Sequence, residues 1–148
     1  MANEVGAEMA SSADTPDPCV FCEIVAGRAP SHKVYEDEKT LAFLDLFPLT
    51  RGHLLVIPKR HGARLTDFGA EDQAALLKTL EQMCRRAERL TSDYNVGLNA
   101  GARAGQIVFH LHFHLIPRYG EANPFQPRQR VRLSDDAARS VIADLSVP

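Results

Sequence analysis

The sequence predicts one α+β domain in which an antiparallel sheet of about five strands packs against a single long helix. The chain has 148 residues, a length typical of one domain with one core. Apolar residues between 71 and 90 recur at positions i, i+3, i+4 and i+7, which is the pattern of an amphipathic helix. Short segments rich in β-branched and aromatic residues flank this helix, and successive segments joined by turns pair antiparallel. We therefore assign residues 18–148 to one domain.

The elements before the long helix are bounded by turn-forming residues. Gly27 ends a helix, the polar turn Asp37-Glu38 joins two strands into a hairpin, and Pro58 closes a third strand because proline cannot donate to a ladder. The expected elements are a short helix over 19–26 and strands over 33–36, 39–45 and 53–57.

The elements after the long helix include the segment richest in histidine. We expect strands near 94–99 and over 107–116, with a glycine-rich turn at 101–105 between them. A C-terminal helix is expected over 134–145, because Ser134 is a favourable N-cap and two aspartates follow it.

Residues 1–17 contain no lysine or arginine and no continuous apolar segment, and we expect them to form a disordered tail. A secretory signal or a transit peptide would need those features, so we expect a cytoplasmic protein. No apolar run approaches the ~20 residues that span a bilayer, and a net charge of −2 provides no general basic field for nucleic acid. We expect neither a membrane nor a nucleic-acid partner.

Three histidines alternate with apolar residues in the last predicted strand. His110, His112 and His114 would share one face of that strand, about 6.6 Å apart, close enough to surround one phosphate or to divide between a metal and a substrate. A solvated strand face and a histidine-only zinc site are the alternative interpretations. The residues expected on the opposite, core-facing side are Ile107, Phe109, Leu111, Phe113 and Leu115.

Residues 110–116, His-Leu-His-Phe-His-Leu-Ile, resemble the His-φ-His-φ-His-φ-φ signature of the histidine triad (HIT) superfamily. The resemblance runs from about Cys19 to Tyr119 and is closest to the small Hint branch, in its bacterial form with a Cys-x-x-Cys. It implies a HIT-like fold, a homodimer whose sheet continues across two subunits, and a purine nucleotide or nucleotide conjugate as ligand. The supporting segments, in the same order as in the family, are 19–24, 41–45, 52–61, 99–101, 105–106 and 116–118.

The resemblance also implies an activity. His112 would be a nucleophile that attacks the α-phosphate of a nucleoside phosphoramidate or related nucleotide, and His114 would place and stabilise the phosphate. The resulting nucleotidyl-histidine would then be hydrolysed by water. Two alternatives stay open, a dinucleoside polyphosphate hydrolase and a catalytically slow nucleotide-binding regulator.

Further binding residues follow from the same resemblance. Asn99, Gly105 and Gln106 would line the phosphate site, where loop 101–106 could offer backbone N–H donors. Asp45 would accept from ribose hydroxyls, although a turn-capping carboxylate is the alternative. The expected base slot, whose members could equally be ordinary core residues, consists of Val20, Phe21, Ile24, Phe43 and Leu46.

A Cys-x-x-Cys pair near the start of the domain indicates a metal site. Cys19 and Cys22 can hold two positions of a tetrahedral zinc ion, and no βαβ context supports a redox pair. Likeness to zinc-bearing members of the superfamily implies His53 and His110 as the other ligands of a structural zinc. His32 and His61 are interpreted as solvated.

Two features depart from the family pattern. The position after Gln106, often serine or threonine in the family, is Ile107, and an apolar side chain cannot protonate a leaving amine. The segment 121–132 is divergent and leaves the choice of substrate open. Its arginines, which we interpret as a solvated basic face, are Arg128, Arg130 and Arg132.

Overall fold

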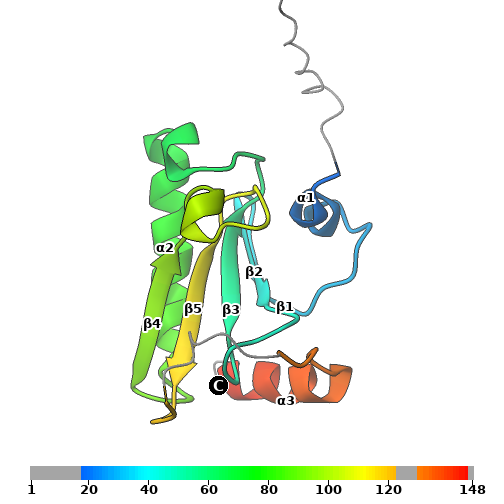
Figure 1. The fold of residues 1–148 in the computed structure, drawn as a ribbon, viewed down its shortest axis with the longest axis vertical. Helices are drawn as coiled ribbons and strands as arrows, with labels where there is room; N and C mark the ends of the chain where they lie inside the picture. The colour runs from blue at the N-terminus through cyan, green and yellow to red at the C-terminus, as the bar shows by residue number, and fades with distance from the viewer. Residues whose placement is uncertain (1–17, 123–129, 147–148) are drawn as a thin grey trace, which may run out of the picture.

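A computed structural model describes residues 18–122 and 130–146, so the expected tail over 1–17 lies outside the described residues. The strands form one antiparallel sheet in the order β1-β2-β3-β5-β4 (Figure 1), which confirms the predicted α+β fold. The strands are β1 (Lys33–Glu36), β2 (Thr40–Leu44), β3 (Leu54–Pro58), β4 (Asp93–Leu98) and β5 (Phe113–Arg118). The α-helices are α1 (Val20–Val25), α2 (Ala70–Ala87) and α3 (Asp135–Leu145), and two 3-10 turns lie at Leu65–Asp67 and Ala102–Ala104.

Both faces of the central strands are covered, which explains why every residue of β2 and β3 is buried. Successive side chains of a strand point to opposite faces. Ala42 and Leu44 of β2 accordingly pack into the core that α2 and α3 complete, whereas Leu41 and Phe43 pack against α1. Figure 1 shows α2 and α1 on opposite sides of the sheet. None of the helices within the described ranges is long and apolar enough to cross a membrane.

The C-terminal helix is tied to the rest of the domain at its start. Ser134 Oγ accepts a hydrogen bond from Ala137 N at 3.1 Å, as the predicted N-cap requires. Leu133 N donates to Leu46 O at 2.7 Å, and Val141 and Leu145 are buried in the α2 core. These contacts fix the chain just before α3 beside the loop that follows β2.

The prediction of a strand over 107–116 is wrong in its first half. Strand β5 begins at Phe113, which pairs with Val56 of β3 and with Leu98 of β4. Residues before Phe113 pair with neither strand. Before that point the chain follows the segment after β3 instead, and Leu111 N donates to Gly62 O at 2.7 Å. Without ladder partners, this segment does not keep the alternation of a strand. Ile107 and Phe109, expected in the core, are 85% and 49% exposed.

Candidate active site and metal centre

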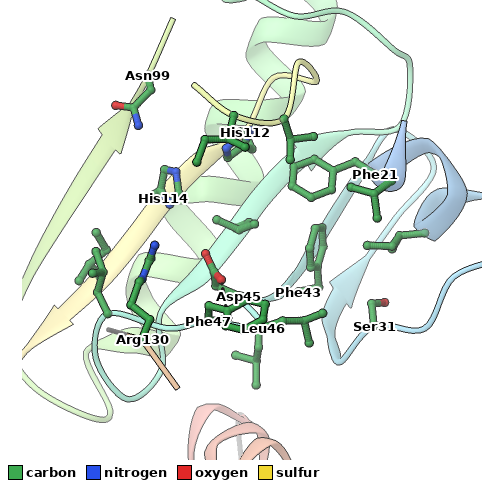
Figure 2. A pocket seen from close by; sticks show the side chains of 18 of the residues that line it. Phe21, Ser31, Phe43, Asp45, Leu46, Phe47, Asn99, His112, His114 and Arg130 are labelled. Atoms are coloured by element: carbon green, nitrogen blue, oxygen red, sulfur yellow. Dashed lines mark hydrogen bonds between the residues drawn. The ribbon is translucent and has the colours of Figure 1, made fainter. Parts of the chain in front are cut away.

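A cavity of about 520 Å³ opens on the α1 side of the sheet. One end of it is aromatic, with Phe21 and Phe43 in edge-to-face contact at 5.4 Å, and the other end carries His114, with His112 between Phe21 and His114 (Figure 2). The sequence-predicted residues that line this one cavity are Val20, Phe21, Ile24, Phe43, Asp45, Leu46, Asn99, Gly105, His112 and His114.

Gln106 is the predicted pocket residue that does not line the cavity. Its side chain is buried, its Oε1 accepts from Gly101 N at 2.8 Å, and its Nε2 donates to Ala63 O at 3.0 Å. Its role is to hold the 101–106 loop in shape. Gly105 has φ +94°, and a Cβ there would meet Asn99 Nδ2 at 3.5 Å, so a larger residue would be strained by its backbone conformation.

The loop also uses its own backbone donors. Ala104 N and Gln106 N both donate to Gly101 O, and Gly105 N donates to Ala102 O. Gly101 N is bonded to Gln106 as described above. These four N–H groups are therefore committed within the loop, which corrects the expectation that they would be offered to a phosphate.

His112 is held in a tautomer suited to a nucleophile. Its Nδ1 lies 2.7 Å from His110 O, and because a carbonyl oxygen can only accept, Nδ1 must carry the proton. In the neutral ring the lone pair is then on Nε2. Burial lowers the pKa of His112, while the bond to His110 O and the charge of Asp45 oppose that shift. Phe21 packs edge-to-face on the ring at 5.1 Å and fixes its plane.

His114 is held in the opposite tautomer by a chain of hydrogen bonds. Leu49 N donates to His53 Nδ1 at 3.0 Å, so the proton of neutral His53 is on Nε2. That Nε2 donates to His114 Nδ1 at 3.0 Å, which leaves His114 with its proton on Nε2. Burial lowers the pKa of His53 to about 3 and that of His114 to about 4, so both rings are neutral near pH 7. The cavity therefore contains one imidazole with a free lone pair and one with a free N–H.

Asp45 caps a turn, as one of its two predicted roles requires, and it also lines the cavity. Its Oδ1 accepts from Phe47 N at 2.8 Å and caps the turn after β2, while Oδ2 lies 3.6 Å from His53 Nε2. Burial raises the pKa of Asp45, and the bond from Phe47 N opposes that shift. Of the two carboxylate oxygens, Oδ1 is thus engaged by the backbone of the turn.

A second cluster lies beside the cavity and brings together Cys19, Cys22, His61 and His110. One ligand atom of each lies within 4.8 Å of the others. Cys19 Sγ is 3.5 Å from His110 Nδ1, and Cys22 Sγ is 3.3 Å from His61 Nδ1. A tetrahedral ion with zinc–ligand bonds near 2.0–2.3 Å separates its ligands by about 3.3–3.8 Å, so these side chains fit zinc.

The tautomer of His110 supports the same assignment. Its Nε2 lies 2.8 Å from Pro58 O and must donate to it, which leaves the Nδ1 lone pair directed at both thiols. Burial raises the pKa of Cys22 to about 11, and the neighbouring Cys19 adds to that shift. A cation between the sulfurs is the partner that would hold them as thiolates.

The structure corrects one predicted metal ligand. His53 lies at the start of β3 and contacts His114, whereas His61, interpreted from sequence as solvated, follows β3 and completes the cysteine cluster. The register explains the exchange. Leu55 pairs with His114 in antiparallel strands, so residues before His114 lie toward the end of β3 where His61 is found. That register is the signal that could have identified His61 from sequence.

Among the further residues that line the cavity, two stand at positions that depart from the family pattern. Ile107, at the position of the missing hydroxyl, lies on the cavity wall. Arg130, interpreted as part of a solvated basic face, also lines it, close to Asp45 and His114 (Figure 2).

The fold and the site together define a small α+β protein with a histidine-lined pocket beside a Cys₂His₂ cluster. The HIT domain family matches residues 26–121. The chain therefore belongs to the HIT family, as the sequence resemblance predicts.

Solved structures and relatives of the family resemble the chain over most of its length. A zinc-bound histidine triad family protein from Mycobacterium smegmatis is 40% identical with a TM-score of 0.73, and the match covers 86% of this chain and 92% of that one. Protein hit of Bacillus subtilis is 46% identical over 109 residues, 72% of this chain and 75% of the relative. The adenosine 5'-monophosphoramidase of Candida albicans is 43% identical over 110 residues, 70% of this chain and 72% of the relative.

Proposed function

We propose that this protein binds a purine nucleotide conjugate in the cavity and cleaves it at the α-phosphate through a nucleotidyl-histidine intermediate. The observation that carries the proposal is the pair of complementary tautomers at the histidine end. His112 Nε2 has a lone pair, and His114 Nε2 has a proton. A nucleophile beside a hydrogen-bond donor is what attack on a phosphate requires.

The proposed reaction has two displacements. His112 Nε2 attacks phosphorus, the bond from phosphorus to the leaving group breaks, and the leaving group departs with the electron pair, an amine taking up a proton as it leaves. The N-phosphorylated ring is then cationic, and the Nδ1 proton donates to His110 O, which stabilises that charge. Water next attacks phosphorus and gives up a proton, which balances the one taken up by the amine; the P–N bond breaks, and the lone pair returns to Nε2 with release of a nucleoside monophosphate.

Substrate placement follows from the two ends of the cavity. The aromatic end formed by Phe21 and Phe43 would take the base, and Asp45 Oδ2 would accept from ribose hydroxyls. The His114 Nε2 proton would donate to a phosphate oxygen on which charge increases in the transition state. Similarity to the Candida albicans adenosine 5'-monophosphoramidase supports phosphoramidates as the first substrate class to test.

Ile107 favours a second candidate, a dinucleoside polyphosphate hydrolase. No hydroxyl is present at this point of the cavity wall to protonate a leaving amine. A nucleotide leaving group departs as a stable anion and needs that proton less.

We further propose that zinc occupies the Cys₂His₂ cluster. It would be held by Cys19, Cys22, His61 and His110, and would supply folding free energy by joining α1 to the segments that follow β3 and precede β5. Its proposed role is structural, because all four protein ligands leave no open position for a substrate.

A homodimer through β4 is also proposed. This strand lies at the edge of the sheet, Val96 on it is 44% exposed, and Leu77 on α2 is 66% exposed. Open edge strands pair readily with a second chain. Sedimentation of the purified protein should give a dimer, and Val96→Lys should shift it to monomer.

Incubation with adenosine phosphoramidate, diadenosine polyphosphate or AMP, followed by acid quench and intact mass spectrometry, tests the activity. The wild-type protein should turn over at least one conjugate and carry an adenylyl adduct. His112→Ala should lose both while its affinity for AMP stays within about tenfold, since a nucleophile contributes more to the transition state than to ground-state binding. His32→Ala is the matched control and should behave as wild type. AMP binding without turnover or adduct from any conjugate would instead support a regulator.

A further inference from the structure

Arg130 is the only lysine or arginine among the described residues that line the cavity. A nucleotide brings negative charge into this cavity, beside the carboxylate of Asp45. The charge of Arg130 reaches Asp45, His53 and His114, but no ion pair joins Arg130 to a described carboxylate. Among residues 18–122 and 130–146, its guanidinium is therefore a positive charge without an ion-pair partner at contact distance.

The position of Arg130 is set by the fold. Three residues later Leu133 N donates to Leu46 O at 2.7 Å, and Ser134 then caps α3, whose Val141 and Leu145 are buried. The backbone near Arg130 is thus anchored to the loop after β2, next to Asp45. Arg130 itself is exposed, at the mouth of the cavity.

Figure 2 places Arg130 at the histidine end of the cavity, below His114 and away from Phe21 and Phe43. A base in the aromatic end and an α-phosphate at His112 leave the leaving group to extend from the histidine end toward solvent. Arg130 is exposed on that side of the cavity, near Asp45 and His114 and away from the aromatic end (Figure 2). Its planar guanidinium suits two-pronged binding of a carboxylate or a phosphate.

We propose that Arg130 determines specificity by selecting nucleotide conjugates whose leaving group carries a carboxylate or phosphate close to the bond that breaks. This proposal rests on the function proposed above and identifies the class of its leaving group. Arg130 would contact only that outer anion and would take no part in bond making or breaking at phosphorus.

Three adenosine 5'-phosphoramidates with primary-amine leaving groups test it: β-alanine brings a carboxylate, O-phosphoethanolamine a phosphate, and propylamine no charge. The measured quantity is the ratio of kcat/KM for each anionic conjugate to that for the neutral one. The intrinsic reactivity of each P–N bond is the same for every variant. A change in the ratio between variants therefore measures how the protein recognises the leaving group. The carboxylate and phosphate conjugates separate the two possible anions.

The wild-type ratio should exceed that of Arg130→Gln by about tenfold for at least one anion, the effect of one exposed charged hydrogen bond. Arg130→Lys should keep part of the preference. Arg132→Gln, which removes an equal charge two residues away and outside the cavity lining, should keep all of it.

Equal losses on all three conjugates, or no loss on any, would overturn the role of Arg130. Calorimetric Kd values for the same conjugates give the same comparison without turnover. Absence of hydrolysis by the wild-type protein would therefore contradict the proposed function, while the binding ratios would still decide whether Arg130 recognises an outer anion.

Discussion

His53 Nε2 donates to His114 Nδ1 at 3.0 Å, and this bond determines which nitrogen of His114 carries a proton. His53 can donate there because its other ring nitrogen accepts from Leu49 N, a backbone group that can only donate. The backbone of the loop after β2 thus sets the tautomer of an imidazole two hydrogen bonds away. His53 is a positioning residue for the proposed reaction, since it reaches the cavity through His114.

A double-mutant cycle tests this coupling. His114→Ala should lower kcat by about 10²-fold, the low end for a positioned proton donor. His53→Ala should lower kcat by the same factor or less. The double variant should be no slower than His114→Ala alone, because both substitutions remove the same hydrogen-bonded pair. Melting temperatures of all variants control for loss of fold. Additive losses in kcat would show that His53 acts independently of His114.

Acid should destabilise the folded protein partly through His53. Burial lowers the folded-state pKa of His53 to about 3 from its usual value of 6.5. Between these values the unfolded chain binds a proton that the folded protein does not, so the free energy of unfolding falls as pH falls below about 6.5. Above that pH the group contributes no slope.

Urea denaturation of wild type and His53→Gln at pH 7.5, 6 and 5 measures this contribution. The wild-type free energy of unfolding should fall more steeply, by up to about 1.4 kcal/mol per pH unit, which is the limit for one proton. Parallel curves for the two proteins would assign the acid sensitivity to other groups.

Much of the fold was predictable because its signals are local. The periodic apolar residues of α2, the Ser134 cap of α3 and the apolar runs of β2 and β3 each reflect one element and its burial. The catalytic and nucleotide-binding residues predicted by family resemblance also meet in one cavity, apart from Gln106.

The failures concern residues whose role depends on partners distant in sequence. Alternation before Phe113 resembles a strand, yet β3 and β4 offer no ladder partner there. His53 and His61 lie in one matching segment, and only the pairing of β3 with β5 decides which of them lies near the cysteines. Arg130 is distant in sequence from every other cavity residue, and no local pattern links it to them.

Zinc analysis tests the reassigned ligand. The purified protein should carry about one zinc per chain, and Cys19→Ser with Cys22→Ser should lower both zinc content and Tm, because metal binding contributes folding free energy. His61→Asn should do the same, with a fall in Tm of about 5 °C or more. His32→Asn is the control, since His32 contacts Asp135 and lies outside the cluster. No zinc in protein refolded with excess Zn²⁺ would remove the site.

The position of Ile107 allows the leaving-group chemistry to be tested by introducing a hydroxyl group. It is 85% exposed and lies on the cavity wall, so a smaller polar residue there disturbs little packing. If the missing hydroxyl limits protonation of the leaving group, Ile107→Ser should accelerate cleavage of alkyl phosphoramidates by about 10²-fold or less. A substrate with an acidic phenol as leaving group, which departs as a stable anion, should change little.

Ile107→Ala is the matched control, because alanine and serine differ by the hydroxyl alone. Selective acceleration of the alkyl amine substrate by serine and not by alanine would assign the effect to proton donation. Equal acceleration by both would mean that the bulk of Ile107 had obstructed the leaving group. No change on either substrate would mean that another group donates the proton. The N–H of His114, whose ring centroid lies 4.9 Å from that of His112, would be the next to test in the same pair of substrates.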